Sequence, residues 1–261
     1  MGTFRSTKSR NRANNPQENT KPDTILFLDI DGCLTRGKFA RYDLAALQAL
    51  EQLVQQSPTG VVLCTGRSLS YIETLAQIVR FGRYAITDHG ALLYDYLNDD
   101  VIPAPQMTPA VRLRIQEMAQ YLAAHKNSLD VHWEMSHGKE ACVSLVAEKG
   151  KTAEDVYAVV TANLNTDGFD LHCSGRALDI APHGVNKWMG VQHFLHHTGR
   201  EAASLRLAAI GDSQGDLPIL SQVDFAACPA NAVDVIKDLC HYVSPEAEIY
   251  GVLDIYRRHF A

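Results

Sequence analysis

The sequence predicts an α/β protein in which a parallel β-sheet is flanked by helices and a second, α+β domain is inserted between its two halves. Short, continuous apolar runs end in acidic or hydroxyl residues, which is typical of buried parallel strands with polar groups at their carboxyl ends. Helical patterns alternate with these runs near both ends of the chain. Between residues 89 and 182 this alternation gives way to hairpin-like strands around longer helices, which indicates a separate domain.

The first half of the predicted sheet has three strands separated by two helices. The first helix places its leucines and Val54 on one face, as an amphipathic helix does. Ser70 and Glu73 have the spacing of a capping box, which predicts that the second helix begins there and ends near residue 80. The expected strands are residues 24–30, 60–65 and 84–87, and the first helix spans residues 43–56.

The inserted region is expected to have two layers, with two helices packed on a sheet. In the longer helix, apolar side chains from Val111 to Leu122 recur on one face. The expected helices are residues 109–125 and 152–163, and the expected strands are residues 91–96, 129–135, 141–147, 171–173 and 177–180.

Alternating strands and helices then resume and complete the sheet. The expected helices are residues 186–197, 217–222, 232–239 and the C-terminal segment, with strands at 205–210 and 225–228. We therefore divide the chain into a disordered tail (1–22), a split core (23–88 and 183–261) and an inserted domain (89–182).

Composition and charge narrow the classes of partner. The 261-residue chain is 46% hydrophobic and 21% charged, with a net charge of −6 and no basic stripe, so nucleic acid is a poor candidate. No apolar run approaches the roughly 18 residues of a membrane span, and the polar N-terminus lacks the apolar segment of a secretory signal. The six cysteines form no CxxC pair, which favours reduced thiols and a cytoplasmic protein.

Two carboxylates follow the first strand, at Asp29 and Asp31, with Gly32 next in the chain. Acids two residues apart at a strand end project from the same edge of the sheet. They suit a nucleophile, Asp29, beside a general acid and base, Asp31. A solvated acidic loop is the alternative when this motif is considered by itself.

Three further motifs lie at predicted strand ends or helix starts. Thr65, Gly66 and Arg67 follow the second strand, where a hydroxyl and backbone N–H groups can bind phosphate. Lys187 opens a helix and can neutralise an anion if it points toward the same edge. Asp212 and Asp216 follow a later strand, and two such acids suit a hard cation such as Mg²⁺. Each motif alone also fits an ordinary strand-to-helix turn or a solvated side chain.

In their order and context these four motifs resemble those of the haloacid dehalogenase superfamily of phosphohydrolases. The insertion point and the α+β texture of residues 89–182 resemble a type IIB cap, as in Cof-type, sucrose-phosphate and trehalose-phosphate phosphatases. The segment from Cys228 to Ala232 is similar to the tail of Cof-type members, where an asparagine orders the metal loop, and Asn231 takes that place.

The resemblance implies a Rossmann-like core, an inserted cap and a Mg²⁺-dependent phosphatase with an aspartyl-phosphate intermediate on Asp29. It implies Mg²⁺ held by Asp29, the backbone carbonyl of Asp31, Asp212 and Asp216, the last directly or through water. Lys187 is expected to hold Asp29, and Thr65, Gly66, Arg67 and Asn231 are assigned to the phosphate-binding region.

The resemblance favours a small phosphate ester, with a sugar phosphate implied by the cap type. Among the polar residues of the insert (His132, Glu134, His137, Lys139, His172, Ser174 and Arg176), Glu134 and Arg176 are the selected substrate contacts. A sugar phosphomutase or phosphotransferase on the same fold is the alternative activity. A receiver-type module lacks an inserted cap, and a non-catalytic binding protein would lack one of the motif residues. We expect a monomer with no nucleic-acid or membrane partner.

Overall fold

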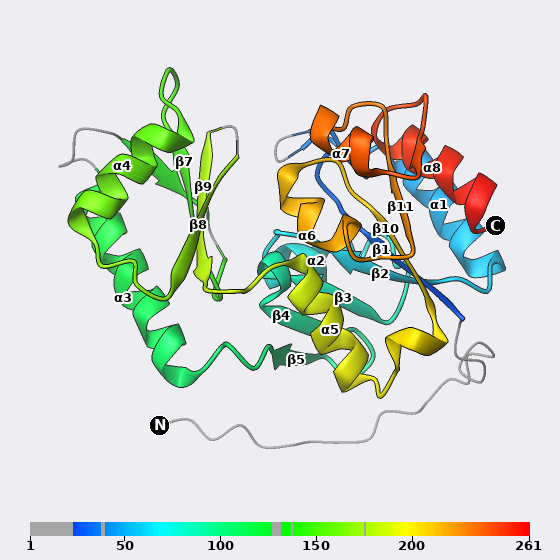
Figure 1. The fold of residues 1–261 in the computed structure, drawn as a ribbon, viewed down its shortest axis with the longest axis horizontal. Helices are drawn as coiled ribbons and strands as arrows, with labels where there is room; N and C mark the ends of the chain where they lie inside the picture. Colours follow the sequence, from blue (N-terminus) through cyan, green and yellow to red (C-terminus); the bar gives the residue numbers. More distant parts are fainter. Residues whose placement is uncertain (1–22, 38–39, 127–131, 137, 175) are drawn as a thin grey trace.

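The computed structural model describes residues 23–37, 40–126, 132–136, 138–174 and 176–261, and Figure 1 shows them as two lobes. The large-sheet lobe comprises residues 23–103 and 183–261, and the small-sheet lobe comprises residues 104–182. The predicted tail (1–22), His137 and the beginning of the strand expected at 129–135 lie outside the described residues. No described helix is long and apolar enough to cross a membrane.

The large sheet has eight strands in the order β12-β11-β10-β1-β2-β3-β4-β5. The strands from β12 to β3 are parallel, whereas β4 and β5 are added antiparallel at one edge. Strand β1 therefore lies between β10 and β2, near the centre of the sheet. The bounds are β1 Thr24–Leu28, β2 Gly60–Cys64, β3 Tyr84–Thr87, β4 Leu92–Asp95, β5 Asp100–Pro103, β10 Arg206–Ile210, β11 Phe225–Cys228 and β12 Tyr242–Val243.

Helices cover both faces of this sheet, so alternate residues of a strand enter two different apolar cores. Leu26 and Leu28 pack with α1, α2 and α8, while Ile25 and Phe27 pack with α5, α6 and α7. This burial on both sides explains why β1 is a continuous apolar run rather than an alternating one. The bounds are α1 Leu44–Gln56, α2 Leu69–Leu75, α5 Lys187–His197, α6 Leu217–Leu220, α7 Asp234–Leu239 and α8 Glu248–His259, with short 3₁₀ turns η2 Asp88–Gly90, η3 Ala202–Ser204 and η4 Gln214–Asp216.

The small sheet has four antiparallel strands in the order β6-β7-β9-β8, with two helices over one face. Leu145 of β7 and Leu178 of β9 pack with Ile115 of α3 and Val156 of α4 in a separate apolar core. Alternate residues such as Asp179 therefore point away from the helices, and Asp179 reaches His89 of the large-sheet lobe. The bounds are β6 Trp133–Met135, β7 Val143–Ala147, β8 Phe169–Ser174, β9 Ala177–Pro182, α3 Pro109–His125 and α4 Ala153–Asn163.

The structure corrects the start of the inserted region. Residues 91–96 were assigned to the insert, but β4 hydrogen-bonds antiparallel to β3, and β5 extends the same sheet. Leu93 is buried in the core beneath α5, so its apolar side chain stabilises the large-sheet lobe. The small-sheet lobe consequently begins after Pro103 rather than at residue 89.

The predicted capping box of Ser70 and Glu73 is also wrong. Helix α2 begins after Ser68 and ends at Leu75, where Ile78 and Val79 donate to the carbonyl of Leu75 in a turn. The Ser70 hydroxyl pairs with that of Ser68, 3.2 Å away, rather than with a backbone N–H of the helix. The observed helix is therefore shorter than the amphipathic pattern predicted.

Candidate active site

Segments that are distant in the sequence meet at the carboxyl edge of the parallel strands. Asp29 follows β1, Thr65 follows β2, and Asp212 follows β10 by two residues. Since β1 pairs in parallel with both β2 and β10, its neighbours end at the same edge. Helix α5 then brings Lys187, its first residue, to this edge. The sequence-based expectation that these motifs converge agrees with this geometry.

Lys187 connects two of the acids. Its Nζ lies 2.7 Å from Asp29 Oδ1 and 2.5 Å from Asp216 Oδ1, and all three side chains are buried. The start of α5 also approaches the main chain of Gly90 closely. A Cβ added at Gly90 would lie 2.1 Å from the carbonyl oxygen of Asn186. A glycine at that position is thus required for the helix to present Lys187 to the acids.

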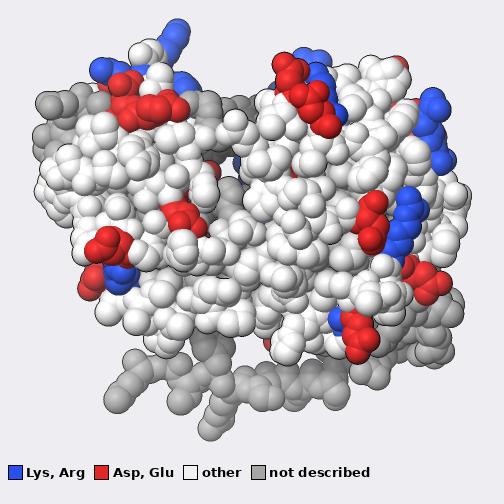
Figure 2. Space-filling view, viewed as in Figure 1, with Lys and Arg blue, Asp and Glu red and all other residues white. Residues whose placement is uncertain are grey.

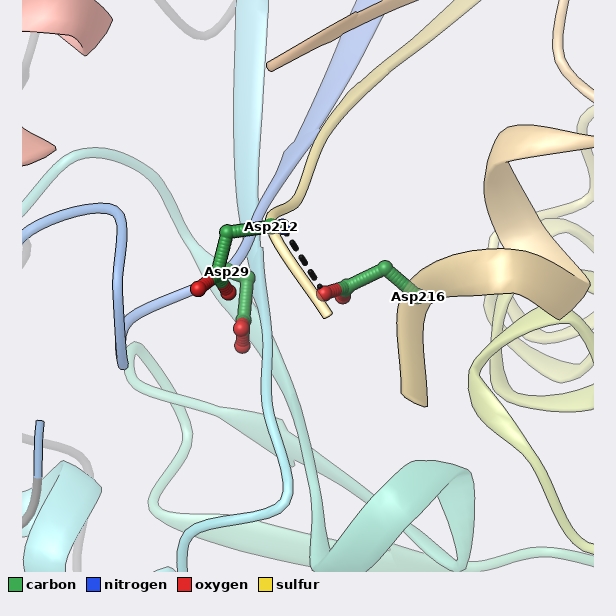
Figure 3. A group of neighbouring side chains, drawn as sticks. All are labelled: Asp29, Asp212 and Asp216. Atoms are coloured by element: carbon green, nitrogen blue, oxygen red, sulfur yellow. Dashed lines mark hydrogen bonds between the residues drawn. The ribbon is translucent and has the colours of Figure 1, made fainter. Parts of the chain in front are cut away.

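Three carboxylates surround one point, as Figure 3 shows for Asp29, Asp212 and Asp216. One carboxylate oxygen from each lies within 4.8 Å of those of the other two. Asp216 Oδ2 accepts hydrogen bonds from the amides of Asp212 and Ser213, both at 3.0 Å, and from the Ser213 hydroxyl. Asp216 therefore holds its own loop with one oxygen and Lys187 with the other.

The cluster has more negative than positive charge. Burial raises the pKa of Asp29 despite the neighbouring Lys187, and Asp216 and Asp212 raise it further. Burial, together with the nearby Asp216, raises the pKa of Asp212 to about 7. Asp212 Oδ1 is buried and accepts no hydrogen bond from the described residues. Two acids with raised pKa values and an unpartnered buried carboxylate oxygen fit a hard divalent cation.

Gly32 is required beside this cluster because its main chain lies against Asp212. A Cβ at Gly32, whose φ is +81°, would lie 1.9 Å from Asp212 Oδ2. A side chain there would displace the carboxylate and also strain the backbone. The Asp29–Gly32 loop can therefore approach the Asp212 loop only with glycine at this position.

Asp31 and Arg67 are paired with each other. Arg67 Nε lies 2.6 Å from Asp31 Oδ2, and a second guanidinium nitrogen lies 2.5 Å from Oδ1, which is a bidentate arrangement. The guanidinium also stacks on the ring of Tyr71, 4.4 Å from its centroid. The Asp31 carboxylate does not belong to the three-acid cluster of the described residues. It is the more exposed of the two motif acids.

Thr65 and Asn231 contact the backbone around the site. The Thr65 hydroxyl accepts a hydrogen bond from the Arg67 amide at 3.1 Å and is buried. Asn231 donates to the carbonyl of Gly32 at 2.9 Å and accepts from the amide of Glu248 at 2.7 Å. Asn231 thus connects the first motif loop to the start of α8, which supports a role in ordering that loop.

Glu134 and Arg176, expected as substrate contacts, are both exposed in the small-sheet lobe. Glu134 lies on the face of β6 opposite to the helices, whereas Arg176 lies in the turn between β8 and β9. The structure also brings His89 and Asp179, which the sequence analysis did not select, to Lys139, and it places Asp88 against the nearby thiol of Cys142. Asp88 and His89 follow β3 directly. The search for polar residues directly after a predicted strand, which identified Asp29, could therefore have identified them too.

On one face of the molecule, the surface charge indicates no further site. Figure 2 shows acidic and basic residues in separate small groups over both lobes of this face, with a notch between the lobes. The exposed charges of this face are not gathered in one patch, so the convergent buried groups at the strand ends are the stronger candidates for chemistry.

Comparisons with known proteins agree with this arrangement. The profile of haloacid dehalogenase-like hydrolases matches residues 26–157 and 119–255. The phosphoglycolate phosphatase of Methanothermobacter thermautotrophicus is 23% identical over 233 residues, covering 89% of this chain and 97% of its own. Phosphoglycolate phosphatase 1 of Saccharolobus solfataricus is 27% identical over 229 residues, covering 87% and 92%.

Solved structures share the fold. A Thermoplasma acidophilum protein superposes with a TM-score of 0.69 at 20% identity, covering 90% of this chain and 97% of that one. The sucrose-phosphatase of Synechocystis, solved with sucrose and phosphate, gives 0.65 at 17% identity, covering 92% and 99%. A sugar phosphatase described as HAD subclass IIB gives 0.62 at 17% identity, covering 90% and 98%.

Proposed function

The chain belongs to the haloacid dehalogenase-like hydrolases, and from this membership we propose that it is a Mg²⁺-dependent phosphatase whose nucleophile is Asp29. The observation that carries the proposal is the contact of Lys187 with both Asp29 and Asp216, beside Asp212. Distant segments supply these groups, and a phosphoryl group needs a nucleophile and cations at one place.

Charge explains why the cations are needed. Two unit charges about 4 Å apart repel by ~4 kcal/mol at an effective dielectric constant of 20, so a carboxylate and a phosphate dianion would otherwise stay apart. Lys187 supplies one positive charge next to Asp29. Mg²⁺, bound by Asp29, Asp212, the carbonyl of Asp31 and Asp216 or its water, would offset the remaining charge on the phosphoryl oxygens.

We assign the steps to the residues as follows. Asp29 attacks phosphorus, the bond from phosphorus to the ester oxygen breaks, and Asp31 gives a proton to that oxygen. Asp31 then takes a proton from the water that attacks the aspartyl phosphate, which regenerates Asp29. Arg67 holds Asp31 with two hydrogen bonds, and we propose that the Arg67 guanidinium also contacts the phosphoryl oxygens. The Thr65 hydroxyl and the amides near Gly66 complete the phosphate-binding loop.

We propose that the small-sheet lobe acts as the cap, which covers the ester side of the site and excludes water. Its sheet face opposite α3 and α4 carries Glu134 and Asp179. Two substrate classes have support: a sugar phosphate, from the cap type, and 2-phosphoglycolate, from the names of the relatives. Glu134 and Arg176 remain proposed contacts to the ester's organic part.

A phosphotransferase or sugar phosphomutase is the second candidate, because Asp31 can activate a hydroxyl as well as a water. The acceptor decides between them. Release of inorganic phosphate without an added acceptor supports the phosphatase, while transfer to a sugar hydroxyl with little phosphate release supports the alternative.

The test of the proposal is an assay of the purified chain with a panel of phosphate monoesters, with Mg²⁺ and with a chelator. Phosphate release that requires Mg²⁺, together with acid-quenched protein phosphorylated on the peptide containing Asp29, is the expected result. Hydrolysis that continues in the chelator, or a phosphorylated peptide elsewhere in the chain, would contradict the assignment.

A further inference from the structure

A second charged cluster crosses the junction of the two lobes. Lys139, in the connection between β6 and β7, places Nζ 3.2 Å from Asp179 Oδ1 and 3.3 Å from His89 Nε2. His89 Nε2 also lies 3.5 Å from Asp179 Oδ2. The Lys139 side chain is 10% exposed, so it is held largely away from solvent but still reachable. Lys139 and Asp179 come from the small-sheet lobe and His89 from the large-sheet lobe.

This cluster adjoins the proposed phosphate-binding loop. The His89 ring lies so close to Gly66 that a Cβ there would be 2.4 Å from its Cε1. Gly138, the neighbour of Lys139, lies against the hydroxyls of Ser70 and Ser68 at the beginning of α2. The Lys139 ammonium is therefore separated from Gly66 by a single imidazole ring. The cluster thus lies next to the phosphate-binding loop, at the edge of His89.

Asp179 fixes the ammonium in place. Burial alone would raise the pKa of Asp179, but His89 and Lys139 outweigh it and hold that pKa well below its usual range. Asp179 thus remains a carboxylate throughout the neutral range. On the sheet it lies opposite Ser144 of β7 and His172 of β8, so its strand is held from both sides.

The remaining partners of the ammonium are weak. An ammonium has three N–H donors, and Lys139 Nζ lies near the Asp179 carboxylate, His89 Nε2 and the Cys142 thiol. A thiol is a poor acceptor, and the 3.2 Å between Lys139 Nζ and Asp179 Oδ1 exceeds the 2.7–2.9 Å of a close ammonium–carboxylate contact. An added carboxylate would therefore replace a weak contact with a strong one, whereas a neutral hydroxyl would gain less.

We propose that Lys139, positioned by Asp179, determines specificity by binding a carboxylate on the organic part of a phosphate monoester. This proposal rests on the phosphatase function above and deepens it by naming the substrate class: a short phosphorylated hydroxy acid. The phosphoryl group lies at Asp29 and Lys187, and the carboxylate lies at the junction of the lobes. Asp179 acts through Lys139 and is a positioning residue.

The test uses two substrates that differ at one group, 2-phosphoglycolate and 2-hydroxyethyl phosphate, in which CH₂OH replaces the carboxylate. We expect wild-type kcat/KM to favour 2-phosphoglycolate. We expect Lys139→Met to lower kcat/KM about 10- to 100-fold for 2-phosphoglycolate, the range for a lost hydrogen bond to a charged group, and about threefold or less for 2-hydroxyethyl phosphate. Lys139→Arg should recover part of the loss, and Lys151→Met, at an exposed lysine of the same lobe, should change neither substrate.

The Asp179→Asn variant distinguishes a loss of Lys139 positioning from a loss of folding. It should raise KM for 2-phosphoglycolate more than for 2-hydroxyethyl phosphate while leaving kcat for 2-hydroxyethyl phosphate near the wild-type value. If Lys139→Met does not fold, Lys139→Arg and Asp179→Asn still give the substrate ratio. Equal losses on both substrates would overturn the proposal and mark the cluster as a structural contact between lobes.

Failure of this proposal is distinct from failure of the phosphatase assignment. Mg²⁺-dependent hydrolysis of phosphates of uncharged sugars, with no preference for an ester that carries a carboxylate, would refute the Lys139 subsite. The assignment of Asp29 as the nucleophile would stand. Absence of hydrolysis for every ester of both classes would instead refute the proposed function.

Discussion

The large-sheet and small-sheet lobes each contribute a lysine held by acids, but they do so in different ways. Lys187 is buried at the ends of parallel strands, where Asp29 and Asp216 reach it from two other segments of the large-sheet lobe. Lys139 pairs with one acid of its own sheet and meets the other lobe through His89. The first arrangement lies within one lobe, whereas the second depends on how two lobes meet.

This difference matches the proposed division of chemistry and selectivity between the two lobes. Parallel strands carry their carboxyl ends to a common edge, so the groups proposed to act on the phosphoryl moiety are brought together by the fold itself. An antiparallel sheet offers one face to its helices and the other to its surroundings. Residues on that other face, such as Asp179, can be substituted to suit another substrate without disturbing the strand ends of the large sheet.

The largest expected effect lies in the large-sheet lobe. Asp29→Asn should lower kcat on the order of 10³-fold or more, because the amide cannot form the aspartyl phosphate. Steady-state assays with the best ester of the panel give the value, and circular dichroism checks the fold. Asp100→Asn, at an exposed acid on the edge of the same sheet, serves as the control. Comparable loss in the control, or near wild-type activity in Asp29→Asn, would contradict the nucleophile assignment.

The next largest difference is expected between the effects of the two lysines on the free energy of unfolding. Lys187→Met leaves two buried acids without their shared cation, and breaking such a pair costs about 3–5 kcal/mol of unfolding free energy in the metal-free protein. Lys139→Met should cost about 1–3 kcal/mol, because one acid and a more exposed side chain are involved. Urea unfolding in chelator measures both. A greater loss for Lys139 than for Lys187 would reverse the comparison.

The stabilisation of the large-sheet lobe by Mg²⁺ should depend on pH. The raised pKa values of Asp29 and Asp212 mean that the folded chain binds protons more tightly than the unfolded chain does. Metal-free stability should therefore fall as pH rises from about 4, the usual carboxyl value, to about 7 for Asp212. Mg²⁺ binds the ionised carboxylates, so its stabilisation should grow over the same window.

Thermal unfolding with and without Mg²⁺ at pH 5.5 and 7.5 measures this effect. The rise in Tm on adding Mg²⁺ should be larger at the higher pH, and Asp212→Asn should reduce it at both. An equal rise at the two pH values would show that the three acids do not form the metal site.

The smallest effects are expected at the exposed residues of the small-sheet lobe. Glu134→Gln and Arg176→Ala should each change kcat/KM less than about tenfold, mainly through KM, because surface contacts in water contribute only about 1 kcal/mol. Neither variant should alter the Tm. A loss that matches Asp29→Asn would mean that the cap supplies a catalytic group, and the division of labour between lobes would fail.

The sequence itself determined the parts of this protein that depend on local pattern and on strand direction. Continuous apolar runs identified β1, β2, β3, β10 and β11, and the helical period identified α3 from Pro109 to His125. Asp29, Asp212 and Asp216 could be predicted to meet because they follow parallel strands, which end at one edge, whereas the contact of Lys187 with Asp29 was implied by the family resemblance. In these segments local propensity and global topology agree.

Tertiary structure determined the features for which the sequence pattern allowed a segment to pair with more than one neighbour. Strand β4 has the apolar pattern of either lobe, and its antiparallel pairing with β3 assigned it to the large sheet. The pairing of Asp31 with Arg67 and the cluster of Lys139, His89 and Asp179 depend on side-chain contacts between distant segments. Such contacts have no sequence period, because packing between separate lobes, rather than hydrogen bonding along one strand or helix, brings these residues together.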